Sequence, residues 1–235
     1  MMTMRAPRRR VREEAEKPFW ISFSDLMTAL MVLFLVVMGV ALLAVTKEAG
    51  ERAQQDTRHR ADIDLILDRL SQAAARYEGV KVDRERRVID FGDRARFGFN
   101  RSTLTPDQEA LLRRFVPEVL DLANDGLGSR LIKRIVVEGH ADRTGTYLGN
   151  LDLSLQRSQR VLCALLAARA ADPLTPAQKA SVRELFMVGG YASNAAKASD
   201  EASRRVELRL EFSGVAEDRA LPAAALEDVG ECALR

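Results

Sequence analysis

Three charged side chains in this sequence have surroundings that could support chemistry. Asp25 is a carboxylate inside a segment that is otherwise almost entirely apolar. Asp142 follows a predicted strand, Leu131–Glu138, and Arg157 lies in the early turns of the helix predicted next, Leu151–Ala170. From the residues alone, an ion pair that only ties the loop to the helix is the favoured interpretation. The alternative is a site for a ligand with both an ammonium and a carboxylate group, because arginine can bind a carboxylate through two parallel hydrogen bonds.

The surroundings of Asp25 restrict what its carboxylate can do. A charge in a membrane-spanning helix costs about 2.5–3.5 kcal/mol on insertion scales, and the apolar segment contains no basic residue to neutralise it. The group must find a partner in another chain or carry a proton for part of the time, because desolvation disfavours the charged form. Its helical face otherwise holds small or aliphatic residues: Ala29, Val32, Val36 and Gly39, bordered by Thr28. That face suits another helix or a narrow aqueous path. The alternative is a hydrated Asp25 at the headgroup boundary.

Residues 19–46 form the predicted membrane span. A helix needs about 20 mainly apolar residues to cross a bilayer, and this segment provides them, with Trp20 as an interfacial anchor. A cleavable signal peptide would have a shorter apolar core of about 7–15 residues and a small-residue cleavage site. The longer run favours an uncleaved single-pass anchor.

The flanking charges predict the orientation of this anchor. The basic segment 1–18 carries five arginines and Lys17, whereas Lys47 and Arg52 after the span are fewer and mixed with acids. The positive-inside rule then places the N-terminus in the cytoplasm and the domain after the span in the periplasm, with the anchor in the inner membrane. The basic segment could also be a nucleic-acid arm, but 36 basic and 34 acidic residues leave a net charge of only +2, which argues against direct nucleic-acid binding.

Residues 47–79 are predicted to be a helical linker. Its apolar residues lie at steps of three and four: Ile63, Ile66, Leu70, Ala73 and Tyr77. This spacing fits a short coiled coil. It equally fits an amphipathic helix that folds onto its own domain, and the sequence leaves both possibilities open.

Residues 80–212 alternate between strand and helix patterns and predict an α/β domain of the α+β type, with helices on one side of a sheet. Strands are expected at Arg87–Phe91, Leu131–Glu138, Glu184–Val188 and Arg205–Phe212. Thr105 is the expected N-cap of a helix, with Pro106 in its first turn and Gln108 in the capping-box position. Residues 213–235 are predicted to be a disordered tail.

An enzyme, a cofactor site and a metal site are all disfavoured. The sequence has no glycine-rich phosphate loop and no nucleophile elbow. Its two histidines, His59 and His140, and two cysteines, Cys163 and Cys232, make a zinc site improbable. The cysteines are expected to be a buried thiol and a tail thiol, with a disulfide bridge as the alternative.

The domain contains several spaced motifs that together resemble OmpA-like peptidoglycan-binding domains. They are Gly139–Gly145 (GHADRTG), Asn150, Leu153–Ser158 (LSLQRS), Val161 and the closing Arg204–Glu207 (RRVE). The resemblance implies a βαβαββ fold in which Asp142 and Arg157 hold the diaminopimelate residue of a peptide stem. It also implies that Asn150, Thr144 and Leu153 line the pocket and that Arg204 contacts the ligand. Ser203 departs from this pattern, which usually has Asn there.

The membrane segment resembles a second family. Ser24–Met31 (SDLMTALM) is similar to the proton-site helix of the B subunits of ion-driven rotary stators, such as MotB of the flagellum, and the longer Trp20–Thr28 is closer to ZorB of Zorya anti-phage systems. The resemblance implies a homodimer inside a ring of multi-span A subunits, anchored to peptidoglycan, with H⁺ or Na⁺ passing through Asp25 and no bound cofactor. The alternatives are a flagellar-type stator subunit, a passive membrane tether, or an energy-transducing subunit like ExbD or TolR.

Overall fold

The computed structural model describes residues 17–167, 170–215, 217, 230 and 232. Most of the predicted cytoplasmic segment, residues 1–16, therefore lies outside the described residues. The chain divides into two compact units, Met1–Asp56 and Thr57–Arg235, and each is described by itself.

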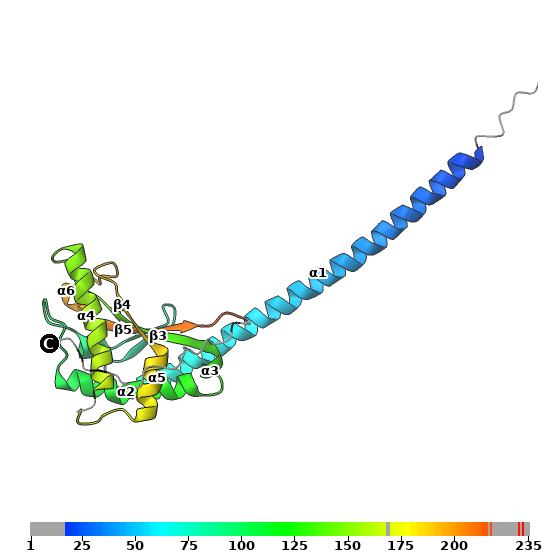
Figure 1. Cartoon of the computed structure of the whole chain (residues 1–235). Coiled ribbons are helices and arrows are strands. Elements are labelled where there is room, and N and C mark those ends of the chain that lie inside the picture. Colours follow the sequence, from blue (N-terminus) through cyan, green and yellow to red (C-terminus); the bar gives the residue numbers. More distant parts are fainter. Residues whose placement is uncertain (1–16, 168–169, 216, 218–229, 231, 233–235) are drawn as a thin grey trace, which may run out of the picture. The chain divides into compact units, whose positions relative to one another are not determined.

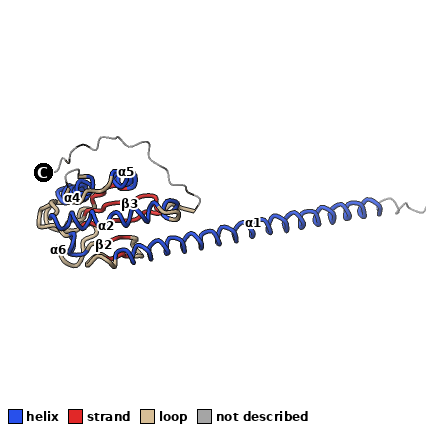
Figure 2. Tube along the Cα trace, turned by 90° about the horizontal axis from the view of Figure 1, so that it is seen from below, coloured by secondary structure: helices blue, strands red, loops and turns tan. Residues whose placement is uncertain are grey.

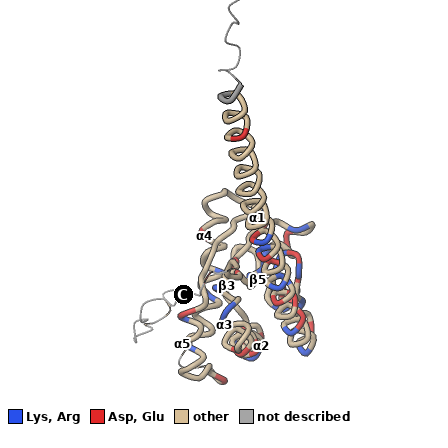
Figure 3. Tube along the Cα trace, turned by 90° about the vertical axis from the view of Figure 1, so that its right-hand side faces the viewer, with Lys and Arg blue, Asp and Glu red and all other residues tan. Residues whose placement is uncertain are grey.

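The described residues of the first unit form the N-terminal part of helix α1, which begins at Lys17 and ends at Ala74 in the second unit. The predicted span lies within this helix, which is long and apolar enough to cross a membrane. Figure 3 shows the N-terminal half of α1 almost free of charged residues. Farther along, the exposed pairs Lys47–Glu51 and Arg52–Glu48 are four residues apart, as on a hydrated helix.

The second unit combines a mixed sheet with helices (Figure 1). In chain order, its further elements are β1 (Lys81–Asp83), β2 (Val88–Asp90), η1 (Gly92–Ala95), α2 (Pro106–Asn124), α3 (Gly128–Leu131), β3 (Ile132–Gly139), α4 (Tyr147–Leu166), α5 (Pro176–Leu185), β4 (Phe186–Gly190), α6 (Asp200–Ser203) and β5 (Val206–Phe212). The α/β architecture predicted from the sequence is present.

Two of the predicted boundaries, the start of helix α4 and the start of strand β4, differ in the structure because of helix-capping residues. Helix α4 begins at Tyr147 instead of Leu151, because the Thr146 side chain accepts a hydrogen bond from the Gly149 amide. The predicted strand from Glu184 begins only at Phe186. Thr175 and Gln178 form a capping box that starts α5, and this helix takes up the residues through Leu185.

The sheet has the order β1-β2-β5-β3-β4, with only β3 and β4 parallel. Its register places side chains of similar polarity next to one another in rows that run across the strands. One row is apolar: Ile89, Leu208, Val137 and Val188. The next row is Asp90, Glu207, Glu138 and Gly189. Since successive residues of a strand point to opposite faces, one face of the sheet is apolar and the other carries a line of carboxylates.

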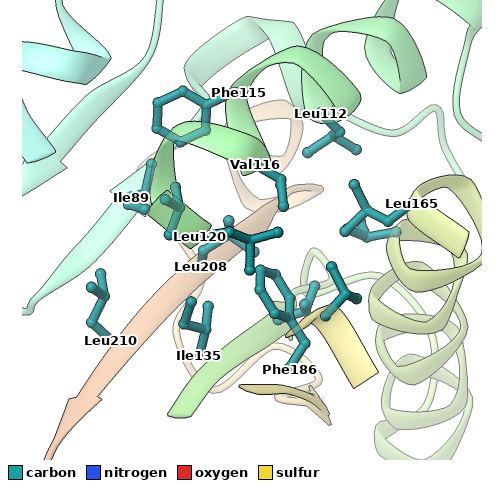
Figure 4. Packing of buried hydrophobic residues seen from close by; sticks show 14 of the residues in the cluster. Ile89, Leu112, Phe115, Val116, Leu120, Ile135, Leu165, Phe186, Leu208 and Leu210 are labelled. Carbon is teal, nitrogen blue, oxygen red and sulfur yellow. The ribbon is translucent and has the colours of Figure 1, made fainter. Parts of the chain in front are cut away.

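The apolar face packs under α2, α4 and α5 (Figure 2). The Thr105 capping box observed at the start of α2 confirms the prediction. Buried side chains of this helix, Leu112, Phe115, Val116 and Leu120, meet Ile135 and Leu208 of the sheet in one core (Figure 4). The core therefore fixes the helices relative to the strands whose ends carry the candidate site.

The C-terminal part of α1 packs onto its own domain. Ile66, Leu70 and Ala74 are at most 2% exposed and belong to the core. The ring of Tyr77 meets that of Phe115 edge-on at 5.2 Å. The apolar spacing therefore belongs to an amphipathic helix that folds onto its own domain, which was one of the two interpretations. The apolar face of this part of α1 is thus buried within a single chain.

The cysteines form a disulfide, which corrects the expectation of two free thiols. Cys163 of α4 and Cys232 are bonded with a Cα–Cα distance of 5.6 Å across 69 residues of sequence. Spacing alone does not reveal a bridge between such distant residues. Two described residues of the predicted disordered tail also contact the domain: the Ser213 amide donates to the Leu131 carbonyl, and Glu217 pairs with Lys133. Most of residues 213–235 lie outside the described residues.

Candidate functional site

Close packing of α4 on β3 and β4 forms the base of the candidate site. Gly139 and Gly190 are partners in the β3–β4 ladder. A Cβ on Gly139 would lie 1.8 Å from the Ser154 carbonyl oxygen, and one on Gly190 would lie 2.9 Å from the Leu155 amide nitrogen. Two glycines thus let the backbone of α4 approach the strand ends. This approach brings Arg157 next to the loop that follows β3.

Arg157 lies completely buried beneath this loop. Its Nε donates to the Arg101 carbonyl at 2.9 Å, its Nη1 to the His140 carbonyl at 2.7 Å and its Nη2 to the Gly98 carbonyl at 3.3 Å. Burial lowers the pKa of the Arg157 guanidinium to about 10, although the nearby Asp142 carboxylate raises it. A desolvated cation held by neutral carbonyls favours additional negative charge nearby.

Asp142 forms its ion pair with Arg204. Its Oδ2 accepts from Arg204 Nη1 at 3.1 Å, and its Oδ1 accepts from the Thr144 amide at 3.0 Å. The Asn150 side chain donates to the Asp142 carbonyl at 3.1 Å and so fixes the loop from below. The Asp142 and Arg204 side chains are 6% and 17% exposed, respectively. They therefore present more surface to a ligand than Arg157 does.

The predicted site residues thus have different positions. Asp142, Asn150, Arg157 and Arg204 are brought together, whereas Thr144 contributes its amide and keeps an exposed side chain. Leu153 is partly exposed on α4. A direct Asp142–Arg157 ion pair, the alternative considered from the sequence, is not among the ion pairs of the described residues, since the Asp142 carboxylate pairs with Arg204.

The loop after η1 contributes residues that the sequence did not indicate. The ring of Phe97 lies 5.1 Å from the Arg157 guanidinium, and the Phe97 carbonyl accepts from Arg204 Nε. Asn100 has a left-handed backbone with φ 51°, and Phe99 beside it is 63% exposed. No side-chain pattern predicts these contacts, because every residue type supplies a backbone carbonyl.

Behind the site, Glu138, His140 and Glu207 form a buried group whose ligand atoms all lie within 4.8 Å of one another. This spacing could suit a metal ion. However, Arg86 and Arg205 already donate to Glu207, and Arg209 donates to Glu138. Because guanidinium groups surround the carboxylates, a further cation is disfavoured, and we assign no metal to this group.

Asp25 lies on the exposed surface of α1. One turn later, the Thr28 hydroxyl donates to the Ser24 carbonyl at 2.7 Å, which satisfies it within the helix. The next cationic side chain along the helix is Lys47. The carboxylate thus lacks a neutralising partner in its own apolar segment.

Comparison with known proteins gives a family for both parts of the chain. Residues 5–48 match the family described as membrane MotB of the proton-channel complex MotA/MotB, and residues 96–205 match the OmpA family. The Zorya protein ZorB of Escherichia coli O139:H28 (strain E24377A / ETEC) is 44% identical over 216 residues, which cover 90% of this chain and 87% of that protein. The chain belongs to the ZorB family.

Two solved structures illustrate the similarity of this ZorB-family chain to known folds. The periplasmic domain of MotB, residues 64–256, is 16% identical with a TM-score of 0.39, covering 54% of this chain and 64% of that chain. The cell wall anchor of the T6SS from Pseudomonas aeruginosa is 21% identical with a TM-score of 0.39, covering 63% and 97%.

The two family matches divide the predicted site residues between them. The MotB match contains Asp25, and the OmpA match contains Asp142, Asn150, Arg157 and Arg204. A ZorB-family chain of this composition is a stator B-type subunit with one membrane helix and an OmpA-type domain, and this make-up agrees with the predicted fold and family.

Proposed function

We propose that this chain is the B subunit of an ion-driven rotary motor of a Zorya-type anti-phage system. In this proposal, Asp25 carries the ion, and the C-terminal domain holds peptidoglycan so that a ring of multi-span A subunits turns around the chain. The observation that carries the proposal is the combination in one chain of an acid within an apolar helix and a domain that sets Asp142 beside Arg204.

The site supports recognition of a ligand that has both charges. The Asp142 carboxylate would accept from the ammonium group of a diaminopimelate side chain, and Arg204 would bind its carboxylate in place of part of the existing ion pair. Arg157 would favour the ligand's negative charge from beneath while it holds the loops through three carbonyls. Asn150, Thr144 and Leu153 would complete the walls of the pocket.

Co-sedimentation with purified peptidoglycan tests the anchoring role. The full-length chain in detergent should sediment with peptidoglycan sacculi, and Asp142→Asn and Arg204→Ala should each raise the apparent dissociation constant at least about tenfold, as the loss of one charge-assisted hydrogen bond implies. Arg143→Ala, an exposed neighbour in the same loop, is the matched control. Unchanged sedimentation of both site variants, judged against this control, would refute the pocket.

The proposed ion path depends on Asp25. One charge that crosses 100 mV is worth about 2.3 kcal/mol, which is enough to bias one step of rotation. Protonation removes the charge of the Asp25 carboxylate and so changes how strongly it is attracted to polar groups of an A subunit. Each protonation would therefore change which A subunit this helix prefers to contact. If two copies of the chain packed through the face that holds Ala29, Val32, Val36 and Gly39, two such carboxylates would lie along the motor axis.

The substitution Asp25→Asn tests this path. We expect this variant to assemble with the A subunit but to lose ion flux and phage protection. The control Asp56→Asn, which changes an exposed acid farther along the same helix, should behave as wild type. Full protection by Asp25→Asn would leave the passive tether, the alternative considered from the sequence. Flagellar motility rescued by this chain would support the flagellar alternative.

The disulfide supports the predicted orientation. Disulfide bonds persist in oxidising compartments such as the bacterial periplasm and are rare in the cytosol, so the Cys163–Cys232 bond favours a periplasmic domain and a cytoplasmic N-terminus. A cysteine introduced at position 3 should be protected from a membrane-impermeant maleimide in intact spheroplasts, and one introduced at Glu85 should be labelled. The opposite pattern would reverse the proposed topology.

A further inference from the structure

A second pocket of the C-terminal domain lies outside the candidate site. It has a volume of about 110 Å³ and is lined by Tyr77, Arg94, Asp107, Leu111 and Arg114; we call it the Tyr77 pocket. An enclosed apolar cavity of about 150 Å³ holds a benzene molecule, so this pocket has room for a somewhat smaller group. Its size therefore suits a carboxylate that carries a few carbon atoms.

The apolar part of this lining is held in place by the core. Leu111 of α2 is 8% exposed and belongs to the core, and Tyr77 packs against it. The Tyr77 ring meets that of Phe115 edge-on, and its hydroxyl donates to the Arg114 carbonyl at 3.1 Å. The hydrocarbon part of a ligand can therefore be buried against two side chains whose positions are already fixed.

Two arginines from separate elements supply the positive charge of the pocket. On α2, Asp107, Leu111 and Arg114 follow one another at steps of four and three residues, so they share one face of the helix. Arg94 comes from η1, and its side chain lies against the main chain of Gly79, where an added Cβ would lie 3.0 Å from Arg94 Cγ. The close approach to Gly79 restricts where the Arg94 side chain can lie.

Both guanidinium groups have only distant carboxylate partners among the described residues. Arg94 Nη1 lies 4.0 Å from the carboxylate of Glu78, whose side chain is 95% exposed, and Arg114 Nε lies 4.0 Å from that of Asp172. These separations are too long for a hydrogen bond. The Asp172 carboxylate instead accepts from Arg113 at 3.0 Å. The donors of Arg94 and Arg114 are thus left for water or for a ligand.

The charges of the lining favour an anion of single charge. Two arginines face one acid, Asp107, so the lining has one positive charge in excess. A guanidinium group can hold a carboxylate through two parallel hydrogen bonds, whereas Asp107 opposes an anion of higher charge. The Tyr77 ring and Leu111 favour a ligand with a hydrocarbon part, which inorganic phosphate lacks.

We propose that the Tyr77 pocket is a second binding site of this domain, for a small monocarboxylate. Arg94 and Arg114 hold its carboxylate, and its hydrocarbon part covers Leu111 and the Tyr77 ring. The C-terminal alanine of a peptide and a free short-chain acid share this chemistry. The site is separate from the proposed peptidoglycan site, because the residues that line it differ from those around the Asp142 carboxylate.

Saturation-transfer NMR on the full-length protein in lipid nanodiscs tests the ligand class. The two probes are propionate, which represents a free acid, and N-acetyl-D-alanine, which represents the end of a peptide. We expect binding of at least one probe, and the tighter of the two identifies the source. Inorganic phosphate should bind about tenfold more weakly, because it cannot bury two carbon atoms. Binding of neither probe, or tighter binding of phosphate than of both, overturns the proposal.

Substitutions in the lining should change the affinity in opposite directions. Arg94→Gln and Arg114→Gln should each weaken binding of the better probe at least about tenfold, as the loss of a charged hydrogen bond implies. Asp107→Asn removes the opposing acid and should strengthen binding. Arg130→Gln, at an exposed arginine of α3 outside the pocket, is the matched control and should bind as wild type. Unchanged affinity in both pocket arginine variants, or weaker binding by Asp107→Asn, overturns the proposal.

Two further measurements keep the outcome clear. The side chains of Arg94 and Arg114 are 49% and 71% exposed, so both variants should keep the wild-type melting temperature, which thermal unfolding checks. Arg204→Ala changes the candidate site and should leave the affinity for both probes unchanged. If Arg204→Ala loses the bound probe and both pocket variants keep it, the probe occupies the candidate site and the proposal fails.

Discussion

Asp142 pairs with Arg204 across 3.1 Å, from the loop after β3 to the residue that follows α6. Arg157 lies beneath them, and among the described residues its guanidinium is held by carbonyls and by no carboxylate. The partly exposed Arg204 and the buried Arg157 therefore suit different tasks. In the proposed site, Arg204 would offer its guanidinium to a ligand, whereas Arg157 holds three loop carbonyls together.

Substitution of the two arginines should separate these tasks. Arg204→Ala should weaken binding of a diaminopimelate-containing peptide by about 10- to 150-fold, equivalent to the 1.5–3 kcal/mol of a charged hydrogen bond, with a smaller loss of melting temperature than Arg157→Ala, because Arg204 is partly exposed. Arg157→Ala should also lower the melting temperature, because three buried carbonyls lose their donor. Calorimetric titration and thermal unfolding of the same samples provide the comparison, and equal melting temperatures for the two variants would contradict it.

Replacement of Glu207 should change how stability depends on pH. The pKa of Glu207 is lower in the folded than in the unfolded chain, where its ordinary value is 4.5, so the stabilisation is present above pH 4.5 and declines as the pH falls below it. Glu207→Gln should cost about 3–5 kcal/mol near neutral pH, because Arg205 and Arg86 lose their buried partner, and should flatten the acid side of the stability curve. Urea unfolding across this range measures the effect, with exposed Glu85→Gln as the control that should keep the wild-type curve.

A methyl group at Gly139 should disrupt the packing of α4. Its Cβ would lie 1.8 Å from the Ser154 carbonyl oxygen, so the helix must move away from the strand. We expect Gly139→Ala to cost at least about 1–3 kcal/mol of folding free energy and to weaken ligand binding through displacement of Arg157. Gly126→Ala, where a Cβ would have no neighbour within 4 Å, controls for the loss of a glycine, and similar melting temperatures for the two variants would refute the packing argument.

Reduction of the disulfide should destabilise the domain. The Cys163–Cys232 bond closes a loop of 69 residues, and loss of such a bond typically costs about 2–4 kcal/mol. Thermal unfolding with and without a reductant should show a lower midpoint for the reduced wild type, whereas the double variant Cys163→Ser, Cys232→Ser should not respond to reductant. A free-thiol assay under denaturing conditions that finds two thiols in the oxidised protein would contradict the bond itself.

Strong periodic and motif signals accounted for most of the fold. The alternating pattern of β5 and the capping box of α2 were visible because each uses side chains in a fixed local order. Strand β1 has only three residues, and α5 ends directly where β4 begins, so neither boundary left a periodic signal. The disulfide joins distant positions and depends on the completed fold.

The sequence predicted which side chains form the candidate site, but it did not predict which groups they contact. Asp142 and Arg157 were expected to meet because a loop after a strand and the next helix share one end of the sheet. The partners of Arg157 are backbone carbonyls at positions 98, 101 and 140, which every residue type supplies. The burial of Glu138 and Glu207 was likewise hidden, because acids that alternate with apolar residues in a strand usually indicate a hydrated face.

The facing glycines of β3 and β4 also bear on how such a pocket can evolve. At Gly139 and Gly190 the backbone of the strands touches the backbone of α4 with no side chain between them. Even a methyl group would force the helix away, so these two positions do not tolerate larger residues and the packing of α4 on the sheet is fixed. Adaptation to a different cell-wall chemistry must then occur through the connecting segments around it, at residues 97–101 and 140–146, while the scaffold keeps its spacing.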